Sequence, residues 1–355
     1  MVTGSDRSAA AGIAGEGAGI ALARAYFEEI VRPILQQAFP GMTYAAGRVG
    51  AGSDVLGLDD ETSRDHDWGL RLNLFVPEGA VGEVDRLLGL QLPERFRGWP
   101  TRFPFTGESL ARHHVHVDTV SGFVSDRLGF DPATAFPVRD WLSISGQAAL
   151  EIVAGPVFTD DPRDLTNARR AIEWYPDDLW RYVLAADWTR LAQELPILGR
   201  ADDVGDRLGA QVIAARLVQA TMHLAFMLER RWPPYAKWFG SMFRRLSCAA
   251  EVGGVLHEVL EASRAGERQR GIAQALDVLL LMQNDLGLTS VPRATVPFWG
   301  RPYLQPDPLI AAQLADGVVD PMVRALPAGF GAIDQRTDNI DILVRPASRR
   351  AMVNG

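Results

Sequence analysis

The stretch GAGSDVLGLDDETSRDHDWG, from Gly50 to Gly69, combines a turn of small residues with a dense group of carboxylates. Glycine lets a backbone approach a ligand closely, and the exposed amides of such a turn, together with a serine hydroxyl, can hold phosphate oxygens. After the turn Gly50-Ala51-Gly52-Ser53 and eleven intervening residues come Asp65 and Asp67. The turn suits an anion, and the two aspartates suit a cation.

Asp65 and Asp67 are two positions apart, so on an extended strand their side chains emerge from the same face, roughly 6 to 7 Å apart at the β-carbons. At an effective dielectric constant near 20, two carboxylates at that distance repel each other by about 2.5 to 3 kcal/mol. A divalent cation relieves this repulsion, and a cation beside an anion-binding turn is the arrangement that presents a Mg²⁺-bound nucleoside triphosphate. The alternative is an acidic surface loop with a capping serine, because Asp, Ser and Gly are common in turns.

Composition restricts the class of protein. The 355 residues include one cysteine, Cys248, which rules out an internal disulfide and fits a reducing cytoplasm. Neither a signal peptide nor a membrane span is expected, because the required apolar runs are absent from the sequence. The net charge of −8 argues against nucleic acid as a partner and suits a small or cationic one.

Hydrophobic periodicity predicts an α+β fold that begins with a mixed α/β segment. Apolar residues at helical spacing predict a helix over 17–39 that kinks or restarts near Pro33. A short helix is expected over 81–90. The runs typical of strands are 42–49, 69–76, 115–120 and, more weakly, 154–158. We therefore expect a first domain over residues 1–161.

The second half of the sequence is helical in pattern. The predicted helices are 176–195, 203–231, 235–246, 251–262 and 268–286. A bundle domain is therefore expected over 162–290, followed by an irregular extension over 291–355 in which DQRTDNIDILV ends in a strand-like run. His223 lies inside an apolar run and is expected to be a hydrogen-bonded core residue rather than a ligand.

Ala51-Gly52-Ser53 followed by Asp65-His66-Asp67 resembles the signature of the nucleotidyltransferase superfamily that includes DNA polymerase β, kanamycin nucleotidyltransferase and the minimal nucleotidyltransferases. That signature is a small residue, Gly, Ser, a short gap and Asp-x-Asp. The downstream text GRADDVGDRLGAQVIAARLV and RRWPPYAKWFGSMFRRL resembles a bacterial nucleotidyltransferase-like family. The resemblance implies a polymerase-β-type domain with a mixed sheet, joined to a helical bundle domain.

By this resemblance, Gly52 and Ser53 grip the triphosphate, and Asp65 and Asp67 coordinate one or two Mg²⁺ ions. Superfamily enzymes complete the second metal site with a carboxylate from a neighbouring strand, and Asp118 in His-Val-Asp-Thr is the candidate here. The alternative for Asp118 is a strand-end or turn aspartate.

His66 departs from the pattern, because an apolar residue usually separates the two aspartates. On a strand it points opposite to them, which favours packing or solvent exposure over metal binding. His113, His114 and His116 form a cluster without cysteine nearby, so zinc is not expected there.

Lys237 is the only lysine of the chain and lies in its helical half. In related enzymes that domain closes over the nucleotide and a lysine can contact the phosphates, so our hypothesis is that Lys237 neutralises the β- and γ-phosphates. The alternative is an accidental surface lysine. Arg200 and Arg71 are further candidates for the same contact. For both, structural ion pairing is the alternative.

The function expected from the sequence is a Mg²⁺-dependent nucleotidyltransferase that moves a nucleoside monophosphate from a triphosphate to a hydroxyl of a small-molecule or protein acceptor and releases pyrophosphate. One alternative is a nucleotide-binding or regulatory module of the same fold without turnover. Another is an enzyme that activates a carboxylate as an acyl-nucleotide in small-molecule biosynthesis.

Overall fold

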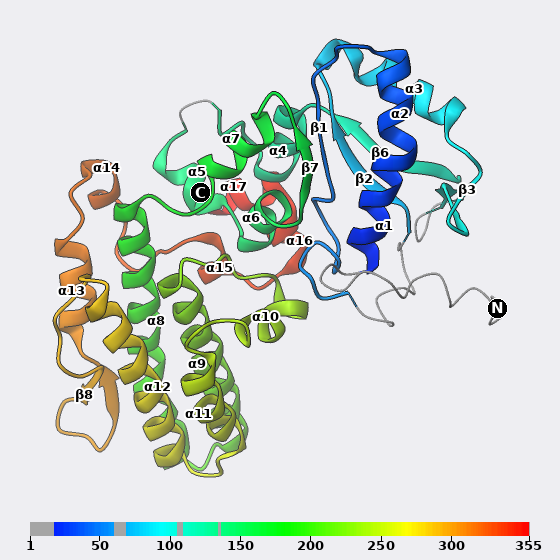
Figure 1. Cartoon of the computed structure of the whole chain (residues 1–355). Helices are drawn as coiled ribbons and strands as arrows, with labels where there is room; N and C mark the ends of the chain where they lie inside the picture. The colour runs from blue at the N-terminus through cyan, green and yellow to red at the C-terminus, as the bar shows by residue number, and fades with distance from the viewer. Residues whose placement is uncertain (1–17, 60–68, 105–108, 134–135, 355) are drawn as a thin grey trace. The chain divides into compact units, whose positions relative to one another are not determined.

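The computed structural model describes residues 18–59, 69–104, 109–133 and 136–354 (Figure 1). The chain divides into a sheet unit, Met1–Ala135 with Ala148–Glu173, and a helical unit, Phe136–Gln147 with Trp174–Gly355. The division therefore differs from the three parts that the sequence predicts. Residues 162–173 belong to the sheet unit, and residues 291–355 share a unit with the helices before them.

The sheet unit is built on a five-stranded mixed sheet in the order β5-β6-β2-β1-β7. The strands are β1 (Ala45–Gly47), β2 (Arg71–Phe75), β5 (Arg102–Phe103), β6 (Arg112–Asp118) and β7 (Val157–Asp160). β2 and β6 run parallel, and the other neighbours are antiparallel. A separate pair is formed by β3 (Arg95–Phe96) and β4 (Trp99–Pro100). The predicted runs 42–49 and 69–76 contain β1 and β2, and the runs 115–120 and 154–158 overlap β6 and β7, so the predicted mixed sheet is confirmed.

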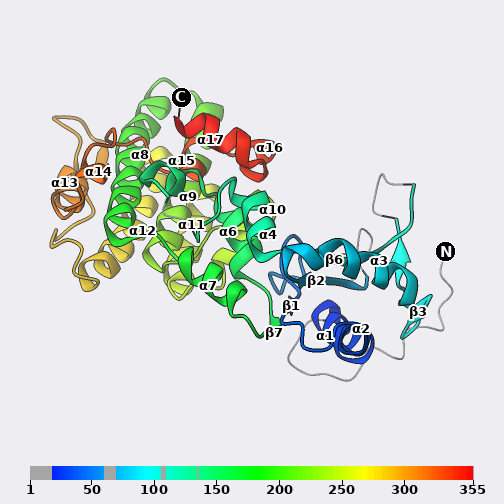
Figure 2. The ribbon, with the colours of Figure 1, turned by 90° about the horizontal axis from the view of Figure 1, so that it is seen from above.

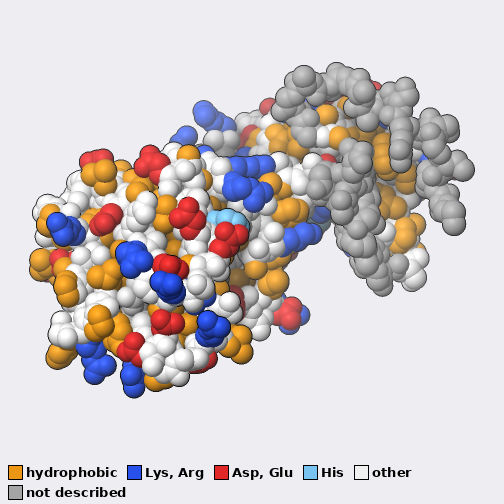
Figure 3. Space-filling view, turned by 90° about the horizontal axis from the view of Figure 1, so that it is seen from below, with side chains coloured by type: hydrophobic (Ala, Val, Ile, Leu, Met, Phe, Trp, Pro, Cys, Tyr) orange, Lys and Arg blue, Asp and Glu red, His pale blue; other side chains and the backbone are white. Residues whose placement is uncertain are grey.

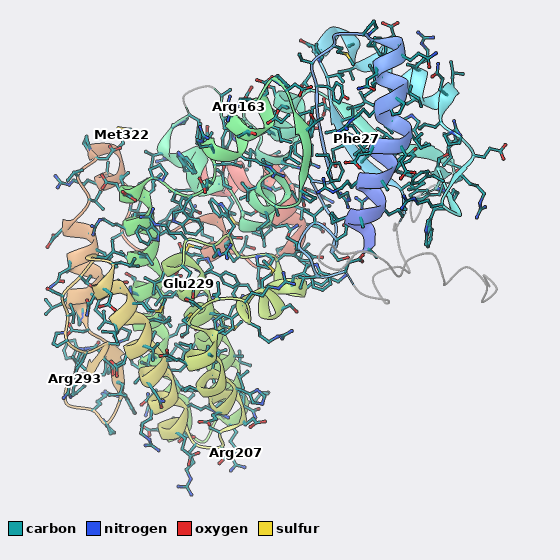
Figure 4. All side chains as sticks on the ribbon, viewed as in Figure 1. Phe27, Arg163, Arg207, Glu229, Arg293 and Met322 are labelled. Carbon is teal, nitrogen blue, oxygen red and sulfur yellow. The ribbon has the colours of Figure 1, made fainter. Side chains whose placement is uncertain are left out.

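One face of this sheet is covered by the N-terminal helical segment, which comprises α1 (Ala18–Tyr26), a π-helical turn η1 (Phe27–Val31) and α2 (Arg32–Ala38), and by α3 (Val81–Gln91) (Figure 2). Leu72 and Leu74 of β2 point into this core, and Phe27 from the helical segment is fully buried there (Figure 4). The predicted restart near Pro33 is confirmed: the proline occupies the first turn of α2, where its missing N–H leaves no hydrogen bond unmade.

The other face of the sheet carries α4 (Val120–Leu128), whose Phe123 packs edge-on against Phe75 of β2 with ring centroids 5.0 Å apart. Successive strand residues point to opposite faces, so Arg71 and Asn73 share the α4 face with Phe75. After β2 and β6, the chain continues to helices on opposite faces of the sheet: α3 follows β2 through the 3₁₀ turn η3 (Glu78–Ala80), and α4 follows β6.

Long helices form the body of the helical unit. They are α8 (Asp177–Asp203), α9 (Arg207–Leu228), α10 (Ala236–Phe243), α11 (Ala249–Glu261) and α12 (Ala265–Asp285). Four of them, α8, α9, α11 and α12, lie side by side (Figure 1). Buried Trp188 of α8 donates its Nε1–H to Oε1 of Gln283 on α12 at 2.8 Å. Acidic and basic side chains are interspersed over the outer surface of this unit (Figure 3). The expected α+β class with a helical C-terminal part is confirmed.

Within the described part of the chain, α9 alone is long and apolar enough to cross a membrane. Its apolar stretch is 61% buried against the neighbouring helices. A helix that is hydrophobic on most faces and surrounded by others behaves as the central helix of a bundle.

The C-terminal region is more regular than the sequence predicts. It contains the hairpin β8 (Thr295–Pro297) and β9 (Leu304–Pro306), then α13 (Pro308–Asp316), α14 (Pro321–Arg324), α15 (Ile333–Arg336), α16 (Ile340–Val344) and α17 (Pro346–Asn354). The strand predicted at the end of DQRTDNIDILV is wrong, because this stretch forms α15 and α16. Asn339 caps α16 by accepting the Ile342 N–H, a helix-start signal that the apolar run obscured.

The segment around α5 (Val138–Ser143) belongs to the helical unit because the C-terminal helices pack on it. Fully buried Arg349 of α17 donates to the carbonyl oxygens of Ser143 at 2.8 Å and Leu343 at 2.6 Å. The Ser145 hydroxyl also donates to the Leu343 carbonyl, at 2.7 Å.

The buried position of Phe27 predicts a large cost for its truncation. Phe27→Ala should lower the free energy of unfolding by about 3–5 kcal/mol, because it leaves a cavity beneath the sheet. Leu90→Ala on α3, where the side chain is 73% exposed, should cost less than about 0.5 kcal/mol. Urea unfolding of both variants measures the difference, and equal effects would contradict this core.

Candidate phosphate-binding site

The turn after β1 depends on two glycines with left-handed backbone geometry. Gly50 has φ +84° and Gly52 has φ +148°, values that other residues rarely adopt. A β-carbon at Gly52 would also collide with the side chains of Asp54 and Arg48. The geometry of this turn therefore requires glycine at both positions. The predicted grip of Gly52 and Ser53 on a triphosphate stays a prediction.

A buried arginine shapes the turn from inside. Arg48 is only 2% exposed, and its guanidinium contacts both oxygens of Asp54, with Nε–Oδ2 at 2.7 Å and Nη2–Oδ1 at 2.8 Å. The remaining N–H groups donate to the carbonyl oxygens of Val49 at 2.7 Å and Ala51 at 2.9 Å. The planar fork of arginine matches a carboxylate in this two-point manner, so the ion pair fixes the path of the chain from β1 through the turn.

Side chains of β2 hold the turn against the sheet. Arg71 Nη2 donates to the Ala51 carbonyl at 2.9 Å, and Asn73 Oδ1 accepts the Val49 N–H at 3.2 Å. Both side chains lie on the face of the sheet that carries α4. The turn is thereby placed at the amino-terminal end of β2.

Beside the turn lies a cavity of about 360 Å³, here called the arginine-histidine cavity. Its lining residues are Arg48, Val49, Gly50, Ala51, Arg71, Leu72, Asn73, Asp85, Arg112, His113, His114, Val115, His116, Val117 and Arg127. Four arginines and three histidines thus face one carboxylate. A pocket lined mainly by one sign of charge concentrates ligands of the opposite sign, so this cavity is suited to a polyanion.

Several of these charges have partners within the sheet unit. Arg127 Nε lies 3.3 Å from Glu151 Oε2, and His113 Nε2 lies 3.5 Å from Asp85 Oδ1. Burial lowers the pKa of Arg127, and the charge of Glu151 opposes this shift. Arginine nevertheless stays charged in proteins, and its N–H groups bind phosphate oxygens in pairs.

Of the predicted site residues, the structure places Arg71 at this cavity, whereas Gly52 and Ser53 are not among its lining residues. Gly52 and Ser53 lie in the turn, and Arg71 reaches it from β2. Asp65 and Asp67, together with His66 between them, lie outside the described residues. Their assignment as metal ligands stays a prediction.

The sequence interpretation missed the basic residues of β1, β6 and α4 that line the cavity. The missing signal was the run Arg-His-His-Val-His-Val-Asp over 112–118, in which alternate residues share one face of a strand. Its histidines were considered for zinc and set aside, whereas their closeness to the turn depends on the pairing of β6 with β2.

Asp118 does not lie at the turn. It occupies the last position of β6, opposite Phe75, whereas Arg71, which touches the turn, pairs with His114 four positions earlier. Four positions along a strand correspond to about 13 Å. Asp118 does not line the cavity; its Oδ1 accepts the Thr119 N–H at 2.7 Å. It ends strand β6, and its Oδ2 lies 3.6 Å from Nε2 of His116, which lines the cavity. Its role as a metal ligand stays a prediction.

Lys237 and Arg200 belong to the helical unit. Lys237 is the second residue of α10, and its Nζ lies 4.8 Å from the ring centroid of Trp238, a cation–π contact. Arg200 is exposed in the last turn of α8, where a positive charge is favourable to the helix dipole. Their predicted contact with phosphates stays a prediction.

Among the residues that the structure describes, no group of three or more His, Cys, Asp or Glu side chains could hold a metal ion. The predicted Mg²⁺ ligands Asp65 and Asp67 fall in the stretch 60–68, which lies outside that search.

His223 of α9 is a buried core residue, as predicted. Its Nδ1 lies 2.8 Å from Oδ2 of fully buried Asp187 on α8. Burial lowers the pKa of His223, but the charge and hydrogen bond of Asp187 outweigh this effect, so the net shift is upward. The pKa of Asp334 is also shifted upward, to about 6, because burial raises the pKa of a carboxyl group. The charges of His223 and Arg349 and the hydrogen bond from the Gly146 N–H act in the opposite direction and lower it.

Comparisons with known proteins address the fold and one segment of the chain. A domain family of unknown function (DUF4037) matches residues 141–239, which is less than half of the chain. The chain is also similar to the crystal structure of a nucleotidyltransferase-like protein from Exiguobacterium sibiricum 255-15, at 12% identity and a TM-score of 0.33 over 74% of this chain and 78% of that one. So loose a likeness carries no argument about function. The comparison with curated proteins gave no match.

The buried Arg48–Asp54 pair predicts an asymmetric response to substitution. Asp54→Ala should lower the free energy of unfolding by about 3–5 kcal/mol, because it leaves a buried guanidinium without its carboxylate. Replacing both partners, as in Arg48→Met with Asp54→Leu, should cost less than Asp54→Ala alone. Urea unfolding measures both, with the exposed substitution Glu83→Ala as control. A double variant less stable than the single one would contradict this role.

The cluster around His223 predicts a pH dependence of stability. A raised folded pKa means that the folded state binds the proton more tightly, so stability is lost as pH rises through that pKa. Between pH 3.8 and about 6, ionisation of Asp334 should therefore lower the unfolding free energy, and deprotonation of His223 should lower it further as the pH rises above 6.5. Asp334→Asn removes the carboxylate contribution, which is on the order of 1–3 kcal/mol. Chemical denaturation of both proteins across this range tests the sign, and an unchanged slope in Asp334→Asn would contradict it.

Proposed function

We propose that the chain is a Mg²⁺-dependent nucleotidyltransferase whose sheet unit binds the phosphates of a nucleoside triphosphate in the arginine-histidine cavity. The observation that carries this proposal is the position of an arginine-lined cavity directly beside a turn of glycines. The paired carboxylates Asp65 and Asp67, close to this turn in the sequence, support it.

In this proposal, some of the described residues contact the phosphates and others position the turn. Arg71 and Arg112 supply charge-assisted hydrogen bonds to phosphate oxygens, and the backbone at Gly50 and Ala51, which lines the cavity, lets the phosphate approach the chain closely. Arg48 acts as a positioning residue, because its groups are committed to the turn itself. Lys237 and Arg200 are proposed as additional phosphate contacts.

In the proposed reaction, the oxygen of the acceptor hydroxyl attacks the α-phosphorus in line. The new P–O bond forms as the bond from the α-phosphorus to the bridging oxygen breaks, and pyrophosphate leaves with that electron pair. The hydroxyl proton passes to solvent. Asp65 and Asp67 would hold Mg²⁺, which would supply positive charge that stabilises the charge developing in the transfer. The acceptor is proposed to be a small molecule.

A second candidate function is nucleotide binding without turnover. It is favoured by the position of Asp118 at the far end of β6 and by the nature of the cavity wall. The one carboxylate among the described lining residues, Asp85, faces His113. A site rich in cations and poor in carboxylates retains a triphosphate more readily than it assembles two metal ions.

A triphosphate and acceptor screen separates these functions. The purified full chain is incubated with Mg²⁺, each nucleoside triphosphate and a panel of acceptors, then assayed for pyrophosphate and analysed by mass spectrometry. Transfer adds the mass of a nucleoside monophosphate to an acceptor. A binding module gives saturable affinity without pyrophosphate, and a carboxylate-activating enzyme gives a hydroxamate when hydroxylamine is present.

Arg71→Ala should weaken triphosphate binding by roughly 10-fold or more, because hydrogen bonds to charged groups contribute about 1.5–3 kcal/mol. Asp65→Asn should remove the Mg²⁺ dependence of binding or turnover and leave the fold intact. Arg86→Ala, an exposed substitution on α3 outside the cavity, serves as the matched control. Isothermal titration calorimetry measures the affinities. Unchanged affinity in Arg71→Ala, or an equal loss in Arg86→Ala, would contradict the assignment.

A further inference from the structure

The carboxyl ends of β2 and β6 form a second place for a ligand in the sheet unit. The two strands are parallel neighbours up to the pair Phe75 and Asp118. From there β2 leads to α3 on one face of the sheet, and β6 leads to α4 on the other. Parallel strands whose following helices lie on opposite faces leave a crevice between their loops, and ligands of such sheets bind there.

A cavity of about 510 Å³ occupies this crevice, here called the carboxyl-end cavity. This volume lies in the range of small-molecule sites. Helix α7 (Asp164–Ala171), which lies beside α4, closes one side (Figure 1). Much of the wall is apolar and comes from three segments: Phe75, Val76, Pro77, Val124, Ala168 and Ala171.

The charged side chains of this cavity are all acidic. Glu78, Asp131 and Asp164 line it, and no Lys, Arg or His is among its described lining residues. The carboxylate of Asp131 is held in place, because its Oδ2 accepts the Ser121 hydroxyl at 2.5 Å and its Oδ1 accepts the Ala133 N–H at 2.8 Å. A cavity that is lined by carboxylates and by apolar side chains favours an organic cation as its ligand.

Other ligand classes fit less well. An anion would meet these carboxylates, and the first turn of α4 is already capped, since Thr119 Oγ1 accepts the Gly122 N–H at 2.8 Å. A metal ion is not favoured either, because the described residues contain no group of three suitable ligands.

We propose that the carboxyl-end cavity is a second small-molecule site, selective for an organic cation with an apolar body, such as an aromatic or alkyl amine. It shares no lining residue with the arginine-histidine cavity. Along β2 and β6 the arginine-histidine cavity is lined as far as Asn73 and Val117, and the carboxyl-end cavity is lined from Phe75 and Thr119 onward, so this site is separate from the proposed transfer reaction. It goes beyond the proposed function and does not depend on it.

The test uses the full chain and three probes of similar shape. Phenethylamine supplies a cation, 2-phenylethanol a neutral body and phenylacetate an anion. Ligand-observed NMR and calorimetric titration should show saturable binding of the amine, weaker binding of the alcohol and none of the carboxylate. No amine binding up to about 10 mM, where only affinities weaker than about −3 kcal/mol escape detection, would overturn the proposal. So would an alcohol or carboxylate that binds as tightly as the amine.

Variants locate the bound amine. Glu78→Gln and Asp164→Asn should each weaken amine binding about 2- to 5-fold, as expected for partly exposed ion pairs, and leave alcohol binding unchanged. Ala168→Leu should abolish the binding of the amine and the binding of the alcohol by filling the cavity. Glu83→Gln, an exposed carboxylate on α3 outside the cavity, is the matched control. Urea unfolding of Ala168→Leu, followed by circular dichroism, checks that the variant is folded without relying on the proposed transfer site. Amine binding that survives all three substitutions would overturn the proposal.

Discussion

The geometry of the proposed phosphate site depends on one buried ion pair. Arg48 lies almost entirely out of solvent, and its hydrogen bonds run only to Asp54 and to carbonyl oxygens of the same short segment. A buried charge is tolerable when its partner and its remaining donors are satisfied together, as they are here. The glycines of the turn then follow as a requirement, because a β-carbon at Gly52 would occupy the space of this pair.

The parallel pair β2 and β6 gives the sheet unit two chemically different ends. At the amino-terminal end of β2, arginines and histidines surround the turn, and Arg71 bonds to it directly. At the carboxyl ends of the two strands, the carboxyl-end cavity is lined by apolar side chains and by carboxylates. The charges that line the two cavities therefore differ in sign, which is why we propose polyanions as ligands of one and organic cations as ligands of the other. A chain with net charge −8 can hold a cationic site because local arrangement, not total charge, sets the field in a pocket.

The sequence alone predicts those structural features that depend on residues close to one another along the chain. The helices, the strands of the sheet, the restart at Pro33 and the glycine turn all follow from local periodicity and backbone preference. The distance of Asp118 from the turn, measured along the strands, depends instead on the register of β6 against β2. The same pairing brings His114 next to Arg71. Burial of Arg349 against Ser143, which joins the last helix to a segment two hundred residues earlier, is likewise a long-range contact. Such contacts leave no local signal.

The most direct test of the central claim is a crystal structure of the chain with Mg²⁺ and a non-hydrolysable nucleoside triphosphate. The account predicts phosphate oxygens in the arginine-histidine cavity, within hydrogen-bond distance of Arg71 and of the backbone after Gly50. The base and ribose should extend away from Arg48, which keeps its contacts to Asp54. A triphosphate bound elsewhere on the chain, with this cavity empty at saturating nucleotide, would contradict the account.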